Sequence, residues 1–224
     1  TSSFRRGVSF AIPPTSLIHV DVDPHEIGKN YPVKLGIVGD AKLVLGRMAK
    51  RLKMLDLQRN YRETEYFRDI QELKRKWFRK LHSFQYSDKI PVTISRCLKE
   101  LREVLPEDAI VVSSSGNAQA QILQEFPFYL PRTNITSGGF STMGFTLPAA
   151  LGAKLAAPNQ PVIGVVGDGD FLMTIQELAT AVQYQIPVII LVLNNMGWQA
   201  ITDLQIATFG EEHKYATEFA SKNG

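Results

Sequence analysis

The sequence predicts an α/β protein in which helices flank a parallel sheet, preceded by part of a second α/β domain. From about residue 89 onward, expected strands alternate with expected helices. The runs at 161–167 and 187–193 are apolar almost throughout, which is typical of strands that are covered on both faces. The first 55 residues contain only two expected strands, which are too few to bury a core of their own.

The N-terminal half is expected to contain two strands and two helices. Apolar and acidic residues alternate over 16–24 and stop at Pro24, which predicts a strand that ends in a turn. A second short strand is expected at 35–38, followed by a helix over 41–55. Apolar residues then recur at helical spacing over 60–83, with charges between them, which predicts a long amphipathic helix.

The C-terminal half continues the alternation. A helix is expected over 91–105 and a strand at 109–113, followed by a glycine- and serine-rich loop. A second strand is expected at 133–137, and a stretch punctuated by glycines follows it. An amphipathic helix over 171–185 is expected to join the two apolar strands as a crossover.

The composition is that of a globular protein with a core. Of the 224 residues, 44% are apolar and 21% charged, and the formal charge of +3 gives no argument for a nucleic acid or membrane partner. The basic run at 73–80 is interpreted as the solvated face of a helix. Cys97 is the sole cysteine, which excludes an internal disulfide and favours a cytoplasmic location, and no apolar run approaches the ~20 residues of a membrane span.

Two polar motifs follow the two apolar strands. Asp168 lies between glycines after the first strand, and Asn195 follows the second strand 27 positions later. Carboxyl ends of neighbouring parallel strands share one edge of a sheet, so these side chains are expected to converge. Their oxygens, with the carbonyl of Gly197, suit Mg²⁺, which usually keeps water and substrate phosphates as further ligands. Gly169 and Asp170 add backbone N–H groups at a helix start, so the sequence predicts a site for Mg²⁺ and a diphosphate.

Each motif taken alone has a simpler interpretation. An Asp between glycines, or an Asn pair after a strand, is usually turn chemistry. Two other phosphate motifs do not fit, because Leu172 stands where a dinucleotide fingerprint requires its last glycine and no Walker A motif occurs. The metal and diphosphate prediction therefore depends on the two motifs occurring together.

These residues resemble the GDG and NN signature of thiamine-diphosphate-dependent enzymes, in particular the acetolactate synthase and pyruvate oxidase group. The run GGFSTMGFTLPAALGA at 138–153 resembles that family's segment beneath the thiazolium ring. Met143, 25 residues before Asp168, stands where the family places the apolar residue that bends the cofactor. The run LIHVDVDPHEIGKNYPVKLGIVGDAK, within the first 42 residues, resembles the second half of the family's central nucleotide-binding domain. The resemblance covers most of the chain.

The resemblance implies thiamine diphosphate and Mg²⁺ as cofactors and a C–C bond made or broken next to a carbonyl, on a 2-oxo acid. The bend brings the aminopyrimidine against the thiazolium, which becomes a carbon nucleophile. It also implies a metal site made by Asp168, Asn195 and Gly197, and a substrate side walled by Trp198 and Ile201. The expected cofactor-binding residues are Ser115, Gly116, Asn117, Ser141, Met143, Gly167, Asp168, Gly169, Asp170, Asn195, Gly197 and Trp198.

The family's activating Glu is expected from a domain that this chain does not contain, usually on a neighbouring subunit, so no catalytic residue is assigned here. The resemblance implies a homodimer or homotetramer with the site at a subunit interface, and the chain is expected to be a fragment. It divides into the second half of a central domain (1–55), a helical linker (56–88) and a C-terminally incomplete diphosphate-binding domain (89–224).

Several positions depart from the family patterns. Ile201 stands where pyruvate-type decarboxylases have a Glu, and Ala118 stands where acetolactate synthases commonly have a His. The run after the asparagines also differs from that of acetolactate synthases. A lyase or decarboxylase of a larger acyl substrate, or a non-catalytic cofactor-binding subunit, is therefore an alternative. Asp170 is expected to cap its helix, and FAD or ADP is a further candidate ligand at the strand ends of the N-terminal part.

Overall fold

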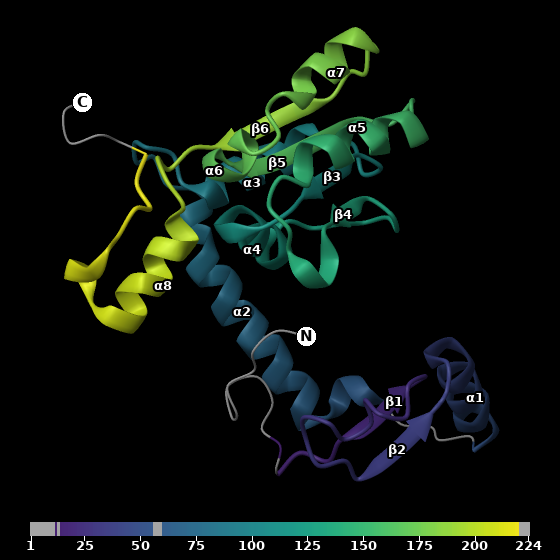
Figure 1. Ribbon diagram of the computed structural model, residues 1–224. Helices are drawn as coiled ribbons and strands as arrows, with labels where there is room; N and C mark the ends of the chain where they lie inside the picture. The colour runs from purple at the N-terminus through teal and green to yellow at the C-terminus, as the bar shows by residue number, and fades with distance from the viewer. Residues whose placement is uncertain (1–11, 13, 56–59, 220–224) are drawn as a thin grey trace. The chain divides into compact units, whose positions relative to one another are not determined.

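A computed structural model of the protein describes residues 12, 14–55 and 60–219 (Figure 1). The chain divides after Glu72 into two compact units. Helix α2 (Glu65–Gln85) contains this division. Among the described residues, every helix is too short or too polar to span a bilayer.

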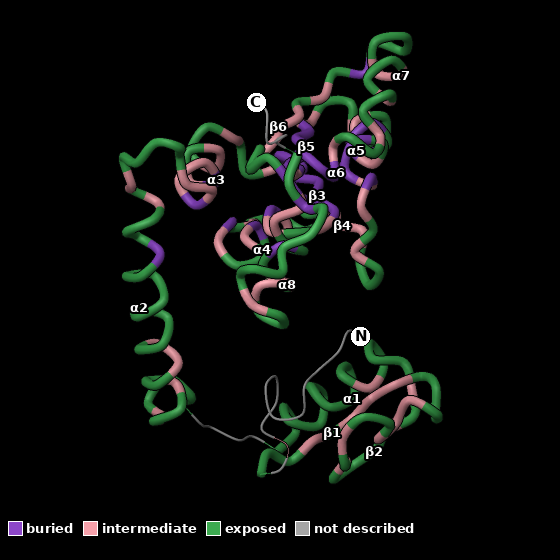
Figure 2. The backbone as a smooth tube through the Cα atoms, turned by 60° about the vertical axis from the view of Figure 1, so that its left-hand side comes forward, coloured by how far each residue is buried: buried purple, intermediate pink, exposed green. Residues whose placement is uncertain are grey.

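The N-terminal unit is built on two parallel strands. Strands β1 (Ile18–Asp21) and β2 (Leu35–Val38) pair in parallel, and helix α1 (Ala41–Met54) follows them. The first strand is shorter than the predicted 16–24, because Asp21 and Asp23 accept hydrogen bonds from backbone N–H groups of the turn that follows. None of the described residues of this unit is buried (Figure 2). Two strands and one helix therefore do not enclose a core here.

The predicted helix over 60–83 begins later than expected. A single 3-10 turn (Tyr61–Glu63) precedes α2, and the Asn60 side chain accepts a hydrogen bond from the Arg62 N–H at its start. Within α2, Leu81 alone is buried. The basic run at 73–80 is exposed throughout, as predicted.

The C-terminal unit contains a sheet of four parallel strands in the order β4-β3-β5-β6. Both central strands are buried along almost their whole length, as their apolar sequences predict. This arrangement, with helices on both faces, confirms the predicted fold class (Figure 1). The strands are β3 (Ile110–Ser113), β4 (Asn134–Thr136), β5 (Val162–Gly167) and β6 (Ile189–Leu193).

Alternate side chains of β3 enter two different cores. Val111 packs against α3 (Ile94–Val104) and α4 (Gly116–Glu125), whereas Val112 packs against α5 (Thr146–Ala156) on the opposite face. Figure 2 shows the buried backbone concentrated on these central strands. Gly164 allows the close approach of α5 and β6, because an added Cβ would lie 2.8 Å from a methyl of Ile190 and 3.1 Å from one of Thr146.

Three helices lie in stretches for which no helix is predicted: α4, α5 and α8 (Gln199–Phe209). Helix α5 is buried on much of its circumference, so its sequence is apolar without a marked helical period. Helix α4 is only ten residues long and begins at Gly116, whose φ is +73°. Short or buried helices of this kind lack the amphipathic signal on which a sequence prediction depends.

The predicted crossover helix over 171–185 is two short helices, α6 (Asp168–Leu172) and α7 (Glu177–Gln183). Between them the Thr174 hydroxyl donates a hydrogen bond to the carbonyl of Gly144, at 3.1 Å. This hydrogen bond to the loop before α5 occurs where the predicted helix is interrupted. The expected apolar face is also largely open, since Val182 is 78% exposed.

Helices α3 and α4 meet at a partly buried carboxyl group. Burial raises the pKa of Glu125 above its usual value, although the Ser95 hydroxyl donates a hydrogen bond to Oε1 at 3.0 Å and acts in the opposite direction. The second oxygen, Oε2, is buried and has no hydrogen-bond partner among the described residues. A raised pKa means that the folded state holds this proton more tightly than the unfolded chain does.

We therefore expect Glu125→Gln to change the pH dependence of stability. The contribution of Glu125 is fully present below its unfolded pKa and is lost as pH rises through the folded pKa. The free energy of unfolding of the variant, relative to the unsubstituted protein, should thus rise as the pH increases above about 4, the usual pKa of a Glu side chain. Urea unfolding at several pH values measures this difference. A difference that stays constant as the pH rises above about 4 would contradict the assignment.

Candidate functional site

A cleft of about 620 Å³, counting its open mouth, lies at the carboxyl edge of the four-stranded sheet. The ends of β5 and β6 and the first turns of α4 and α8 contribute to its walls, as expected for a parallel sheet. It is lined by most of the predicted site residues: Ser115, Gly116, Asn117, Met143, Gly167, Asp168, Gly169, Asp170, Asn195, Gly197, Trp198 and Ile201.

Ser141 is the one predicted site residue that does not line the cleft. Its backbone is left-handed, with φ +48°, and its hydroxyl donates hydrogen bonds to the Ser114 carbonyl and to Gln119 Oε1 at 3.2 and 3.0 Å. Sequence reasoning missed five lining residues, because three belong to helices that were not predicted and two are apolar. They are Ile94, Ala118, Leu193, Gln199 and Ala200.

Asp168, Asn195 and Gly197 come together at the strand ends. Asp168 is 9% exposed, and its Oδ2 accepts a hydrogen bond from the Gly197 N–H at 3.0 Å. One terminal atom of the Asn195 amide lies 3.2 Å from Asp168 Oδ1 and 2.8 Å from the Gly197 carbonyl oxygen. If that atom is nitrogen, it donates to both oxygens. If it is oxygen, three oxygens face one another, which is the arrangement that a cation stabilises.

The donor set at this point fits a hard cation. A carboxylate, an amide oxygen and a backbone carbonyl are ligands that Mg²⁺ accepts, with water and phosphate completing its octahedron. No group of three or more His, Cys, Asp or Glu side chains is placed to hold a metal anywhere in the described part of the chain. The three converging residues are the candidate metal site that the sequence predicts.

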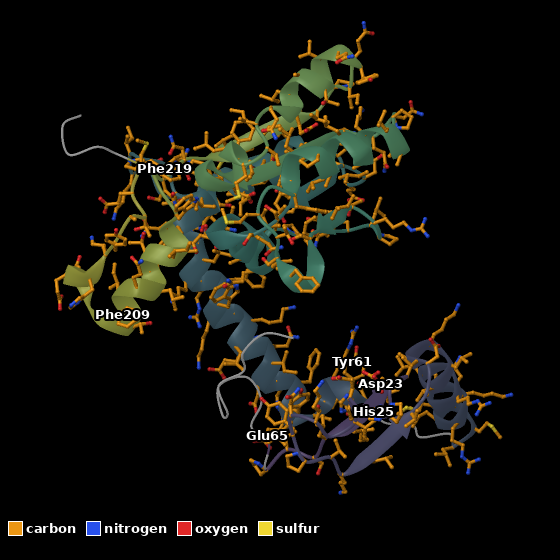
Figure 3. All side chains as sticks on the ribbon, in the orientation of Figure 1. Asp23, His25, Tyr61, Glu65, Phe209 and Phe219 are labelled. Carbon is orange, nitrogen blue, oxygen red and sulfur yellow. The ribbon has the colours of Figure 1, made fainter. Side chains whose placement is uncertain are left out.

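The loop that carries Gly197 is held by a later segment, residues 215–219, which we call the strap. Trp198 N–H donates a hydrogen bond to Thr217 O, and Phe219 N–H donates one to Met196 O, both at 2.8 Å. The buried hydroxyls of Thr202 and Thr217 are joined at 2.7 Å. Figure 3 marks Phe219 at the end of this segment. Nothing local in the sequence indicates the contact.

We expect Thr217→Val to loosen the strap. The substitution removes the hydrogen bond between two buried hydroxyls and leaves that of Thr202 without this partner, which should lower the free energy of unfolding by about 1–2 kcal/mol. Urea unfolding measures this loss. A double-mutant cycle with Thr202→Val should give a coupling energy of at least about 0.5 kcal/mol. Additive effects of the two substitutions would show that the hydroxyl pair does not hold the strap.

Trp198 closes one side of the cleft. Its indole lies against Gly169, where an added Cβ would come within 2.1 Å of Nε1 and 2.2 Å of Cδ1. The ring also meets Phe219 edge-on, with centroids 5.3 Å apart and planes at 83°. Trp198 Nε1 is buried and has no hydrogen-bond partner among the described residues. Glycine at position 169 is thus required for the indole to pack here.

Asp170 does not cap its helix, so that expectation is wrong. It is the third residue of α6, is 5% exposed, and accepts hydrogen bonds from the Ser114 hydroxyl and from the Gly144 N–H. These donors come from the end of β3 and from the loop before α5. The carboxylate therefore bonds to distant segments rather than to the amides of its own helix.

The outer wall of the cleft is formed by the first turn of α8. Asp203 links this helix to α4, because it accepts a hydrogen bond from Asn117 Nδ2 at 3.3 Å. It also accepts one from Gln199 Nε2 of its own helix at 2.8 Å. Ile201, which was predicted to face the substrate, lines the cleft and is 43% exposed. The wall on this side is thus partly apolar and adjoins the predicted metal residues.

Family models match both parts of the chain. The model described as thiamine pyrophosphate enzyme, C-terminal TPP binding domain, matches residues 114–223, and that described as thiamine pyrophosphate enzyme, central domain, matches residues 2–48. The parallel sheet and the cleft at its carboxyl edge agree with such a domain. The chain therefore belongs to the thiamine pyrophosphate enzymes.

Within that family, the chain is similar to large subunits of acetolactate synthase. It is 39% identical to the isozyme 3 large subunit of Escherichia coli (strain K12), over 90% of this chain and 34% of that protein. It is 38% identical to a probable acetolactate synthase large subunit of Methanocaldococcus jannaschii, over 91% of this chain and 34% of that protein. It is 35% identical to the acetolactate synthase of Mycobacterium leprae, over 95% of this chain and 33% of that protein. The chain thus spans about a third of the length of these relatives.

Proposed function

We propose that this chain is the cofactor-binding part of an acetolactate-synthase-like enzyme. The enzyme depends on thiamine diphosphate and Mg²⁺ and makes or breaks a C–C bond next to a carbonyl, on a 2-oxo acid. The observation that carries the proposal is the convergence of Asp168, Asn195 and Gly197 in a cleft that Met143 also lines. The similarity to acetolactate synthase large subunits supports the type of reaction.

In this proposal the residues of the cleft bind and orient. Asp168, Asn195 and the Gly197 carbonyl hold Mg²⁺, and through it the diphosphate. When bound, thiamine diphosphate supplies the carbon nucleophile that attacks the substrate carbonyl. Met143, which lines the same cleft, would support the cofactor, and Trp198 with Ile201 would exclude water from the substrate side.

Proton transfer to the cofactor is assigned to a residue outside this cleft. Asp168 and Asp170 are its only titratable lining residues within the described part of the chain. Asp168 is assigned to the metal, and both oxygens of Asp170 accept hydrogen bonds from the protein. This supports an activating Glu supplied by another domain or by a neighbouring subunit, in a homodimer or homotetramer.

Product analysis with pyruvate tests the proposed reaction. The complete enzyme, including the domain that supplies the activating Glu, should form acetolactate when it is given thiamine diphosphate and Mg²⁺. Cofactor binding without turnover of pyruvate would favour a lyase or decarboxylase of a larger acyl substrate, which the Ile201 and Ala118 departures support. Binding of thiamine diphosphate that does not depend on Mg²⁺ would overturn the assigned metal site.

The proposal also covers the organisation of the chain. Residues 1–55 are assigned to the second half of a central nucleotide-binding-like domain, 56–88 to a linker and 89–224 to the diphosphate-binding domain.

The single cysteine supports a cytoplasmic location. FAD remains a candidate at the ends of β1 and β2. Mass spectrometry of the denatured protein would detect released thiamine diphosphate and any flavin in one experiment.

A further inference from the structure

We propose that Asp170 is a positioning residue, which sets the loop carrying Met143 against the edge of the sheet where the diphosphate binds. It is not assigned as a ligand of either the metal or the cofactor. This inference rests on the proposed function, because it gives Met143 its role as a support of the cofactor.

Both carboxylate oxygens of Asp170 are engaged by protein donors. Oδ1 accepts a hydrogen bond from the Gly144 N–H at 2.5 Å, and Oδ2 accepts one from the Ser114 hydroxyl. Asp170 is 5% exposed and Ser114 1% exposed. A buried carboxylate is costly unless such donors compensate for lost hydration, and hydrogen bonds to a charged acceptor are stronger than neutral ones.

The network around Asp170 joins three separate segments. The Ser114 hydroxyl, at the end of β3, also accepts a hydrogen bond from the buried Thr146 hydroxyl at 2.8 Å. The Ser114 carbonyl accepts hydrogen bonds from the hydroxyls of Ser137 and Ser141, at 2.9 and 3.2 Å. Asp170 therefore links α6 both to the end of β3 and to the loop that leads into α5.

The link reaches the residue next to Met143. Gly144 follows Met143 directly, and its N–H donates to Asp170 while its carbonyl accepts from Thr174. The N–H and the carbonyl of Gly144 are thus both hydrogen-bonded to residues of the segment 170–174, which follows Asp168. These hydrogen bonds thereby connect the segment that carries Met143 to the segment that begins at Asp168.

The chemistry of the network favours a carboxylate over its amide. A carboxylate accepts at both oxygens, which matches one N–H and one O–H donor. An asparagine in the same place would turn an NH₂ group towards one of these donors. Asp170→Asn should therefore loosen the loop that carries Met143 while it nearly preserves the volume of the side chain.

Calorimetric titration with two probes separates positioning from metal binding. With Mg²⁺ present, Asp170→Asn should weaken binding of thiamine diphosphate by roughly ten- to a hundredfold, which corresponds to loss of a hydrogen bond to a charged group. Inorganic diphosphate has no organic ring for Met143 to support, so its affinity in the presence of Mg²⁺ should change by less than about twofold. Asp88→Asn, at an exposed carboxylate on the same unit, is the matched control.

The outcomes distinguish the two proposals. Equal weakening of both probes, or no weakening of either, would overturn the positioning role and leave the proposed function standing. Failure of the unsubstituted protein to bind thiamine diphosphate would overturn both. If Asp170→Asn does not fold, Thr174→Val tests the same link from the Gly144 carbonyl, and it should weaken thiamine diphosphate alone.

Discussion

Asp168→Ala is expected to abolish Mg²⁺-dependent binding of thiamine diphosphate and to leave the fold intact. Asp168 supplies the only charge among the three converging donors, and its Oδ2 fixes the loop through the Gly197 N–H. Without it, the amide and carbonyl oxygens alone are weak ligands for a divalent cation. We expect a loss of affinity of at least about a hundredfold, measured by calorimetry with Mg²⁺ held in excess.

Asp168→Asn serves as the matched variant for this prediction. It keeps the shape of the side chain and one oxygen that can accept from the Gly197 N–H, but it removes the charge. It should therefore resemble Asp168→Ala in cofactor affinity and the unsubstituted protein in circular dichroism and thermal unfolding. Unchanged affinity in both variants would remove Asp168 from the metal site.

Gly169→Ala is expected to displace Trp198. The new Cβ would lie 2.1 Å from the indole Nε1, and the indole cannot retreat easily because Phe219 covers it. Overpacking of this kind should cost about 1–3 kcal/mol of stability, with loss of the cleft wall. The fluorescence of Trp198 should change towards that of an exposed indole. Trp77, the other tryptophan, is replaced by phenylalanine beforehand so that it does not contribute.

Gly152→Ala provides the control for this steric argument. Gly152 lies within α5, and an added Cβ there meets nothing within 4 Å. Alanine is the better helix former, so this variant should be more stable by about 0.5–1 kcal/mol. Equal effects of the two glycine substitutions would contradict the close approach of the indole to Gly169.

The strands were predictable because they are short runs of apolar residues between turns. β5 and β6 differ from the predicted ranges by one or two residues at their first ends. The short and buried helices were not predictable, since a helix such as α5 is apolar on nearly every side. The division of the crossover into α6 and α7 accompanies a contact between Thr174 and Gly144, 30 positions apart.

The candidate metal residues were predictable from one rule of parallel sheets. Asp168 and Asn195 end neighbouring strands, so their meeting follows from the order of elements. The partners of Asp170 were not predictable, because Ser114 lies 56 positions away and only the folded chain brings the two together. An isolated Asp after glycine has the same local sequence whether it caps a helix or bonds to another strand.

The strap also has a consequence for how this fold diversifies. The chain leaves the loop that carries Gly197 at Trp198, runs along α8 and returns to the same loop at Thr217. Because the excursion is pinned at both ends, its far part can change in length or sequence without moving Gly197. Residues 206–214 lie beyond the contacts made by Thr202 and Asp203, and they are therefore the part of this excursion that we expect to tolerate change. Variation there should leave both the wall of the cleft and the candidate metal residues in place.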